Sequence, residues 1–295
     1  ASDATVLMQP DNAAGFLYGG TAGTTQRSDV QAAFAALETE DVQPIVVDLL
    51  SSDWSDELSA HVNRCWAQVA SERVGFTAAA AGASLATLNA ATKTLNNADV
   101  GYGFESVTVP APTSGTVTLD PVWGALIAAS MQTGIAGPGS LLNKRPNIAE
   151  FSCNPAIKPD RDYETLLQMG LLFAYHSGTG IVWMDDYSSY RTDVDDPFRS
   201  HLAPQMSLAL CFRALRESIR SQIGETASIA QKGLIRSIAL TVMAALKSNG
   251  TIRDYNGIDV IESGDTLQVI GEVNPMETLR FVKLALSVTR IAVTA

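Results

Sequence analysis

Apolar residues recur along the first half of the chain at two spacings, which predict alternating helices and strands. Val30, Ala33, Phe34 and Leu37 follow helical spacing, and the next segment, 45–50, is a short, mostly apolar run suited to a strand buried on both faces. Further apolar stripes predict a helix through 58–69 capped at Ser55 or Asp56, helices over 84–95 and 121–135, and strands over 73–77 and 100–109. This alternation is typical of a mostly parallel sheet covered by helices.

The pattern changes near Pro159, and we expect a second domain to begin there. A helix over 164–175 and a strand over 180–184 lead into a polar stretch, 185–196, and then into two long amphipathic helices through Ile219 and Leu246. Strands over 252–261 and 267–273, a short helix over 276–283 and a β-branched run over 286–293 complete the chain. The sequence therefore predicts an α/β domain over 1–159 and a smaller α+β domain over 160–295.

Composition places the chain among globular proteins. Of its 295 residues 46% are hydrophobic and only 17% are charged, which excludes a disordered or fibrous protein. No run approaches the roughly 18 apolar residues of a membrane helix, and the first twenty or so residues lack a signal-peptide pattern, so we expect no membrane insertion. The three cysteines lie far apart and without metal-ligand spacing, which is typical of free thiols in a reducing compartment.

The net charge of −11 is unevenly distributed. Residues 1–160 carry 7 Lys and Arg against 16 Asp and Glu, whereas 199–253 carries 8 basic residues and 2 acidic ones. The overall acidity argues against nucleic acid as a partner. Arg213, Arg216 and Arg220 share one helix face, which is either an ordinary solvated face or a surface for an acidic protein or a neighbouring copy's acidic first half.

Candidate chemistry is sparse. The glycine clusters at 19–23 and 134–140 match neither dinucleotide nor phosphate-loop motifs, and the three histidines are scattered with no nucleophile motif. The stretch 185–196 contains five aspartates without the EF-hand pattern, so a solvated loop is the first interpretation and a cation site the second. We expect no catalytic residue, cofactor or metal. The alternative is an α/β hydrolase using this loop, which predicts a deep pocket holding groups of strongly shifted pKa.

Several stretches occur in an informative order along nearly the whole chain, most clearly from Leu166 onward. They are Leu17–Gly23, Arg73–Phe76, 125–131, Gly180–Met184, Tyr190–Asp193, Arg213–Arg216, 223–225, Gly250–Tyr255 and Val273–Glu277. The series resembles the contractile tail sheath family of phages, tailocins and related injection machines. No single motif is diagnostic; the ordered series is.

This resemblance implies a structural subunit and no enzyme. The α/β domain would have a subtilisin-like topology and lie outward, and the C-terminal domain would face an inner tube. Subunits would polymerise as stacked six-fold rings and contract to drive the tube through the host envelope. The implied partners are other copies of the chain, the tube protein, the baseplate and the tail terminator. The implied location is the virion, after assembly in the host cytoplasm. Family members carry an N-terminal arm, and because this chain starts at Ala1 without Met, we expect a trimmed or partial subunit.

Two sets of residues are the candidates for assembly contacts. We hypothesise that a basic face meets acidic groups on the tube; its members are Arg213, Arg216, Arg220, Lys232 and Arg236. The terminal strand, with Leu286, Val288, Ile291 and Val293, needs a partner because an exposed apolar strand is an aggregation hazard. It either pairs with 267–273 of its own chain or joins a neighbour's sheet, and the resemblance favours the second arrangement.

Overall fold

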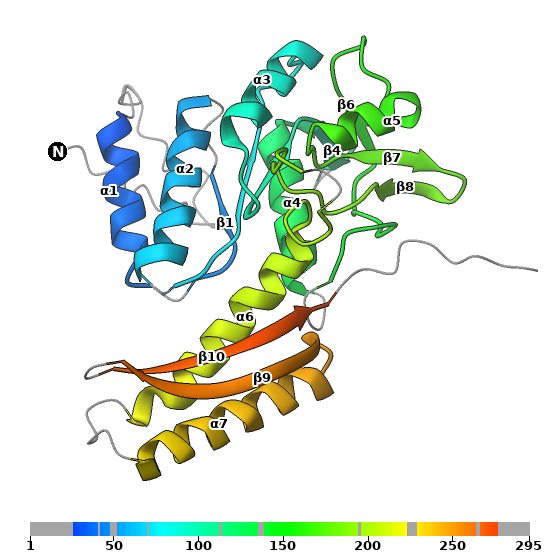
Figure 1. Ribbon diagram of the computed structural model, residues 1–295. Coiled ribbons are helices and arrows are strands. Elements are labelled where there is room, and N and C mark those ends of the chain that lie inside the picture. The colour runs from blue at the N-terminus through cyan, green and yellow to red at the C-terminus, as the bar shows by residue number, and fades with distance from the viewer. Residues whose placement is uncertain are drawn as a thin grey trace, which may run out of the picture.

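The computed structural model describes residues 26–40, 42–47, 52–69, 71–111, 114–134, 139–193, 196–222, 229–263 and 266–276 (Figure 1). The helices are α1 (Arg27–Leu37), α2 (Ser52–Arg64), α3 (Leu85–Leu95), α4 (Pro121–Gly134), α5 (Pro159–Gln168), α6 (Leu202–Ile219) and α7 (Ile229–Ser248). The strands are β1 (Ile45–Val46), β2 (Gly75–Ala78), β3 (Val100–Gly103), β4 (Ser106–Pro110), β5 (Thr116–Leu119), β6 (Glu150–Ser152), β7 (Ala174–Ser177), β8 (Gly180–Trp183), β9 (Ile252–Ser263) and β10 (Thr266–Pro275). A π-helical turn, Cys65–Val69, follows α2.

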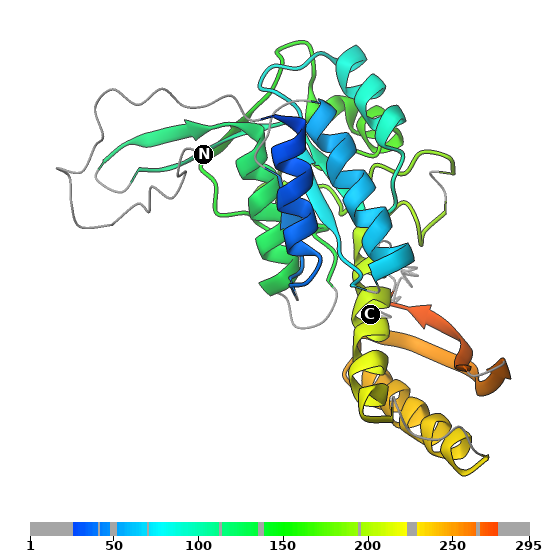
Figure 2. The same cartoon turned by 90° about the vertical axis from the view of Figure 1, so that its left-hand side faces the viewer.

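A three-stranded parallel sheet in the order β1-β2-β3 lies at the centre of the first part of the chain. Ile45 pairs with Gly75, which in turn pairs with Val100. Every residue of β2 and β3 is buried, as expected where helices cover both faces of a sheet. Helix α4 packs on one face and α2 on the other (Figure 2).

Each face of this sheet has its own hydrophobic core. On one side Phe76 packs among the alanines of α4, including Ala125 and Ala128. On the other side Leu58 and Val62 of α2 pack against α1 and the neighbouring strands. The apolar stripes of the sequence therefore face the sheet as their periodicity predicts.

Several predicted elements are confirmed. The helices expected over 84–95 and 121–135 are α3 and α4, and the two strands expected after residue 250 are β9 and β10. The hydroxyl of Ser84 accepts the backbone N–H of Thr87 at 3.2 Å, which caps the first turn of α3.

Three local predictions are wrong. The expected strand over 100–109 divides into β3 and β4, and β4 joins a separate antiparallel sheet in the order β5-β4-β6. The expected helix over 164–175 ends at Gln168, because Gly170 takes a positive φ of 65° and the chain then enters β7. Helix α2 begins at Ser52, so Ser55 and Asp56 lie inside the helix and are not its caps.

The fold is mixed α/β with small sheets. Among the described strands only β1, β2 and β3 form a parallel sheet, and the others pair antiparallel, so the parallel part is smaller than predicted. In the described ranges no helix has the length and apolar content that crossing a bilayer requires.

The hydrophobic cores do not break at the predicted boundary of 159/160. One core joins Tyr102 and Phe104 to Leu166 and Phe173, so the packing continues across Pro159. The change occurs inside α6. Its first turns pack on the parallel sheet through Leu202 and Met206, and its remaining turns pack against α7. Residues 26–206 are called the α/β unit below, and residues 207–276 the C-terminal unit.

Candidate assembly surface

The C-terminal unit has a separate core under a long hairpin. Cys211 of α6 packs with Ala239 and Met243 of α7, and Ile252 and Ile258 of β9 cover them. The two long helices and β9 therefore share one hydrophobic core. In Figure 1 the hairpin of β9 and β10 lies alongside α7 and across the lower part of α6.

The hairpin leaves two strand edges open. Strands β9 and β10 span 12 and 10 residues and pair antiparallel with each other. Within the described residues neither strand pairs with a third, so each offers a row of backbone donors and acceptors on its outer edge. These strands are about twice the usual length of about 5–6 residues. Such long open edges are templates for an added strand.

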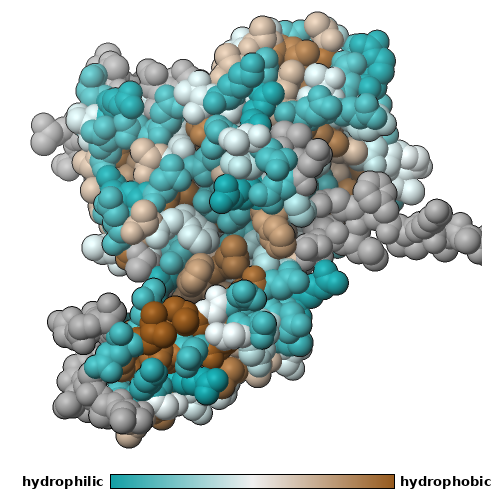
Figure 3. Space-filling view, in the orientation of Figure 1, coloured by the Kyte–Doolittle hydropathy of each residue, from teal (hydrophilic) through white to brown (hydrophobic). Residues whose placement is uncertain are grey.

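The face of the hairpin that points away from the helices carries exposed apolar residues. Ile261 pairs with Gln268, two positions before Ile270, so the two isoleucines are diagonal neighbours on this face. Each is 38% exposed. Figure 3 shows an apolar patch on this side of the C-terminal unit. Apolar side chains beside two open edges are typical of a surface that another chain covers.

Two of the predicted basic residues bind the α/β unit of their own chain. The guanidinium of Arg213 donates to the carbonyl oxygen of Glu72 through Nε at 3.2 Å and Nη2 at 2.9 Å, and to that of Val42 at 3.2 Å. Arg216 binds both carboxylate oxygens of Glu72 in a bidentate pair, with Nη1 at 3.0 Å from Oε1. Burial lowers the pKa of Arg216, which is paired at a half-buried position. These two arginines are therefore occupied within the chain.

The other three predicted basic residues lie farther along the C-terminal unit. Arg220 is 77% exposed and its Nη1 lies 3.7 Å from Glu217. Arg236 lies 3.5 Å from Asp259 and donates to the carbonyl of Ile258 at 3.2 Å. Lys232 is half-buried on α7. Their contact with a tube stays a prediction.

The acidic partners of this region were not predicted from the sequence. Residues 199–253 contain few acids, but Glu72 lies 144 residues before Arg216, and Asp259 lies just after this stretch. Helical periodicity reports which residues share a face. It does not report which distant segment packs on that face, so nothing in the local pattern could have identified Glu72.

The aspartate-rich stretch is divided between a buried site and a surface turn. Asp186 is fully buried, and its Oδ2 accepts the backbone N–H of Ala203 at 2.7 Å in the first turn of α6. Asp196 instead accepts the N–H of Phe198 at 2.9 Å in an exposed turn. Asp195 lies outside the described residues. In the described part of the chain no group of three or more His, Cys, Asp or Glu could hold a metal ion.

Asp185 and Asp186 share one hydroxyl donor. The Oγ of Ser140 lies 2.6 Å from Oδ1 of Asp186 and 3.2 Å from Oδ1 of Asp185, and His201 Nε2 lies 3.7 Å from Oδ2 of Asp185. Burial, followed by the neighbouring Asp185, raises the pKa of Asp186 to about 8. The Ser140 hydroxyl has one proton and can donate it to only one of the two carboxyls at a time. A protonated Asp186 supplies a second donor between them. The side chains of Ser140, Asp185, Asp186 and His201 are all buried.

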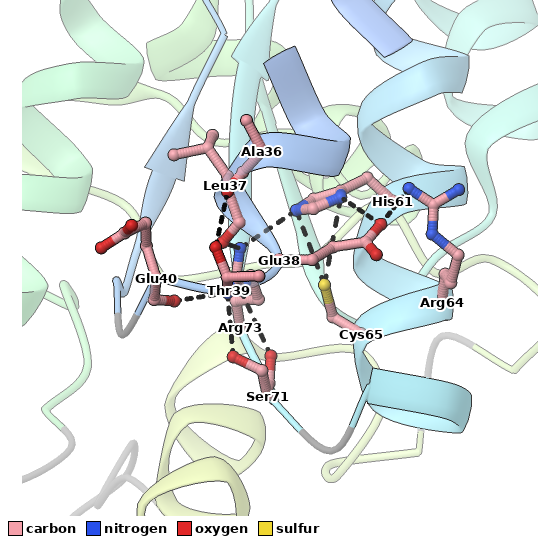
Figure 4. A network of polar contacts seen from close by, with 10 residues as sticks. All are labelled: Ala36, Leu37, Glu38, Thr39, Glu40, His61, Arg64, Cys65, Ser71 and Arg73. Atoms are coloured by element: carbon pink, nitrogen blue, oxygen red, sulfur yellow. Dashed lines mark hydrogen bonds and ion pairs between the residues drawn. The ribbon is translucent and has the colours of Figure 1, made fainter. Parts of the chain in front are cut away.

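A groove of about 650 Å³ lies between α1 and α2, with His61 and Glu38 among its lining residues. Beneath it, Arg73 is fully buried and donates to the carbonyls of Leu37 at 2.9 Å and Glu40 at 2.8 Å (Figure 4). Its Nη1 also lies 3.2 Å from His61 Nε2.

The ionisable groups of this network serve packing. Burial, then the charge of Arg73, lowers the pKa of His61 to about 4, so the imidazole is neutral and accepts from Arg73. Phe34 stacks on the His61 ring at 4.6 Å. Arg64 pairs with Glu38 at the rim of the groove. The groove thus contains one group with a strongly shifted pKa, His61. Its ring is stacked against Phe34 and is bonded to the buried Arg73.

The predicted linking strand, Leu286, Val288, Ile291 and Val293, lies outside the described residues, as do the first glycine cluster and all but the first residue of the helix expected over 276–283. Its pairing stays a prediction.

No family model and no characterised protein matches the sequence. Solved structures do match the fold. The sheath tail protein of Desulfitobacterium hafniense aligns over 89% of this chain and 60% of its own length, with a TM-score of 0.70 and 14% identity. A chain of the anti-feeding prophage baseplate, symmetrised six-fold, aligns over 92% of this chain and 75% of its own length, with a TM-score of 0.68 and 13% identity.

The helical sheath of the anti-feeding prophage in its contracted state is also similar, with a TM-score of 0.65 and 10% identity over 90% of this chain and 76% of that one. At these identities the likeness shows the fold, and the fold is that of contractile tail sheath proteins, as the resemblance implied. The chain spans less than two thirds of the length of the Desulfitobacterium protein.

Proposed function

We propose that this chain, which has the fold of tail sheath proteins, is a structural subunit of a contractile tail sheath. It polymerises as stacked six-fold rings around an inner tube, and the sheath contracts to drive the tube through a host envelope. The observation that carries the proposal is the C-terminal unit, in which a helical pair supports a long hairpin whose outer edges pair with no third strand in the described part of the chain. The matched proteins that come from a six-fold baseplate and a contracted helical sheath support it.

The open edges of the hairpin give the proposal its mechanism. In our proposal the strand of residues 286–293 from a neighbouring copy pairs with β9 or β10, and Ile261 and Ile270 pack against its side chains. Backbone hydrogen bonds then link the subunits, and in this proposal they persist through the rotation of contraction. A strand that stays bonded while subunits rotate lets the sheath shorten without coming apart.

The basic residues of the C-terminal unit face the tube in this proposal. Arg220 and Lys232 are the main contacts, with Arg236 beside them, because Arg213 and Arg216 are held by Glu72. Each exposed pair contributes only about 0–1 kcal/mol, but a ring repeats it in every subunit. The α/β unit lies outward, with the subtilisin-like topology as its proposed wider architecture. A baseplate and a terminator bound the sheath in the assembled particle.

An α/β hydrolase is the competing function, and the buried positions weigh against it. Burial raises the pKa of Asp99, Glu105 and Asp186. Asp186 bonds the first turn of α6 and Ser140, Glu105 accepts the backbone N–H of Ala174, and His61, whose pKa is lowered, bonds Arg73. These contacts hold elements of the fold together.

Electron microscopy tests the proposal. The full-length protein, expressed with its tube protein, is imaged in negative stain beside a variant lacking residues 286–295. We expect tubes or rings from the parent, none from the truncated variant, and melting temperatures of the two isolated subunits within about 2 °C. A parent that stays monomeric on preformed tubes contradicts the sheath function. A truncated variant that still forms tubes, or that loses much of its monomer stability, contradicts the exchange of strands alone.

A further inference from the structure

Helix α6 belongs to both units of the molecule. Its 18 residues run without interruption from the core of the α/β unit, at Leu202 and Met206, into the core of the C-terminal unit at Cys211. Figure 1 shows the helix as the bridge between the two bodies. The direction of the hairpin relative to the α/β unit therefore depends on how the middle of α6 is held.

Two arginines in the middle of α6 meet at Glu72 of the α/β unit. Arg213 and Arg216, one turn apart, both reach Glu72, the first through its backbone carbonyl and the second through its carboxylate. The side chain of Glu72 is only 7% exposed, and Gln43 Nε2 donates to the same carbonyl at 2.9 Å. Two arginines on adjacent turns resist both rolling and tilting of the helix.

Glu72 itself sits on a rigid support. The next residue, Arg73, is fully buried and binds the carbonyls that follow α1, as Figure 4 shows. The indole of Trp66 donates to the carbonyl of Arg73 at 3.0 Å, and its ring meets Phe212 of α6 edge-on at 6.2 Å. The contact point of α6 is thus fixed to α1, α2 and the start of β2 at once.

We propose that Glu72, Arg213 and Arg216 form a clamp that sets the angle between the C-terminal unit and the α/β unit, and so aims the hairpin edges. The clamp makes the two units one rigid body, so a force on either unit is transmitted to the other. Arg213 and Arg216 are positioning residues in this arrangement. The part of the inference that concerns subunit contacts rests on the sheath function; the clamp itself is a property of one chain.

Distances between the units in the isolated full chain test the clamp without any assembly. Spin labels at Thr94→Cys and Ser237→Cys, both at exposed positions, are measured by pulsed electron resonance with Cys153 replaced by Ser. We expect a single narrow distance distribution in the parent. It should at least double in width in the variant carrying Arg213→Met and Arg216→Met. Arg216→Lys should give an intermediate width, since lysine cannot bind both carboxylate oxygens.

The matched control is Arg220→Met, which removes an exposed positive charge at the C-cap of α6, about one turn beyond Arg216. It should leave the distribution unchanged. Should the double variant fail to fold, Glu72→Gln decides the matter, because it keeps the carbonyl bonds and removes the ion pair. A folded double variant, or a Glu72→Gln variant, with the parent's narrow distribution overturns the clamp. Equal broadening in the Arg220→Met control does the same. None of these outcomes depends on tube formation.

Discussion

The buried pair of carboxyls predicts a specific dependence of stability on pH. Asp186 has a pKa of about 8 in the folded chain, raised by burial and by Asp185, against about 3.9 in an unfolded chain. Because the folded pKa is the higher one, the contribution of Asp186 to stability is complete below about pH 4 and is lost as the pH rises through about 8. Within this window the folded chain holds one proton that the unfolded chain releases.

The magnitude follows from that single proton. Between roughly pH 5 and 7 Asp186 lowers the free energy of unfolding by about 1.4 kcal/mol for each pH unit. Asn at position 186 keeps the carbonyl oxygen that accepts from Ala203 and an amide that reaches Ser140, but it does not ionise. The variant Asp186→Asn should therefore lack this slope, and it should gain stability relative to the parent as the pH rises.

Urea unfolding followed by circular dichroism at half-unit steps from pH 4.5 to 8 measures the difference between the two proteins. The difference removes the contributions of other titrating groups such as His61, whose lowered pKa acts with the opposite sign. The control is Asp196→Asn, the same chemical change in a surface turn. If the parent and Asp186→Asn curves run parallel across the window, Asp186 does not hold its proton and the reasoning fails.

Two further predictions concern the C-terminal unit. Arg220→Glu with Lys232→Glu should weaken sheath attachment to tubes at least fivefold in a cosedimentation assay at moderate salt and leave the melting temperature unchanged; unaltered cosedimentation contradicts the tube contact. Gly271→Ala should cost about 1–3 kcal/mol in urea unfolding, because a methyl group there would lie 2.3 Å from the Cδ1 of Ile258 and the core is already filled. Restoration of stability by adding Ile258→Val would confirm that cause, and a neutral Gly271→Ala would contradict it.

The local hydrophobic pattern was enough to predict the elements that local interactions stabilise. Helix α4 follows from an apolar run that ends at a glycine cluster, and β9 and β10 follow from two β-branched runs around a turn. The split of β3 from β4 was missed because the polar pair Glu105 and Ser106, which interrupts this segment, does not by itself mark a change of sheet. The break falls where Glu105 accepts the backbone N–H of Ala174 at 2.6 Å, a contact 69 residues away.

The same limit applies to the assembly surface. The sequence identified the long helices and the arginines on them, because helical spacing determines which side chains share a face. It could not show that Glu72 binds two of those arginines. The domain boundary was placed at a change of composition, whereas the cores change partners inside α6, and composition reports nothing about which side of a helix meets which core.

The shared helix also bears on how the chain is made. One face of the parallel sheet, around Phe76, is closed by Leu202 and Met206. Helix α4 covers part of that face once it is made, and during synthesis from the N-terminus the rest waits for α6, on the order of ten seconds at about 5–20 residues per second. Apolar surface that stays exposed over such an interval is prone to aggregation. A ribosome that pauses before residue 206 would therefore prolong the exposure of apolar surface that α6 covers in the finished fold.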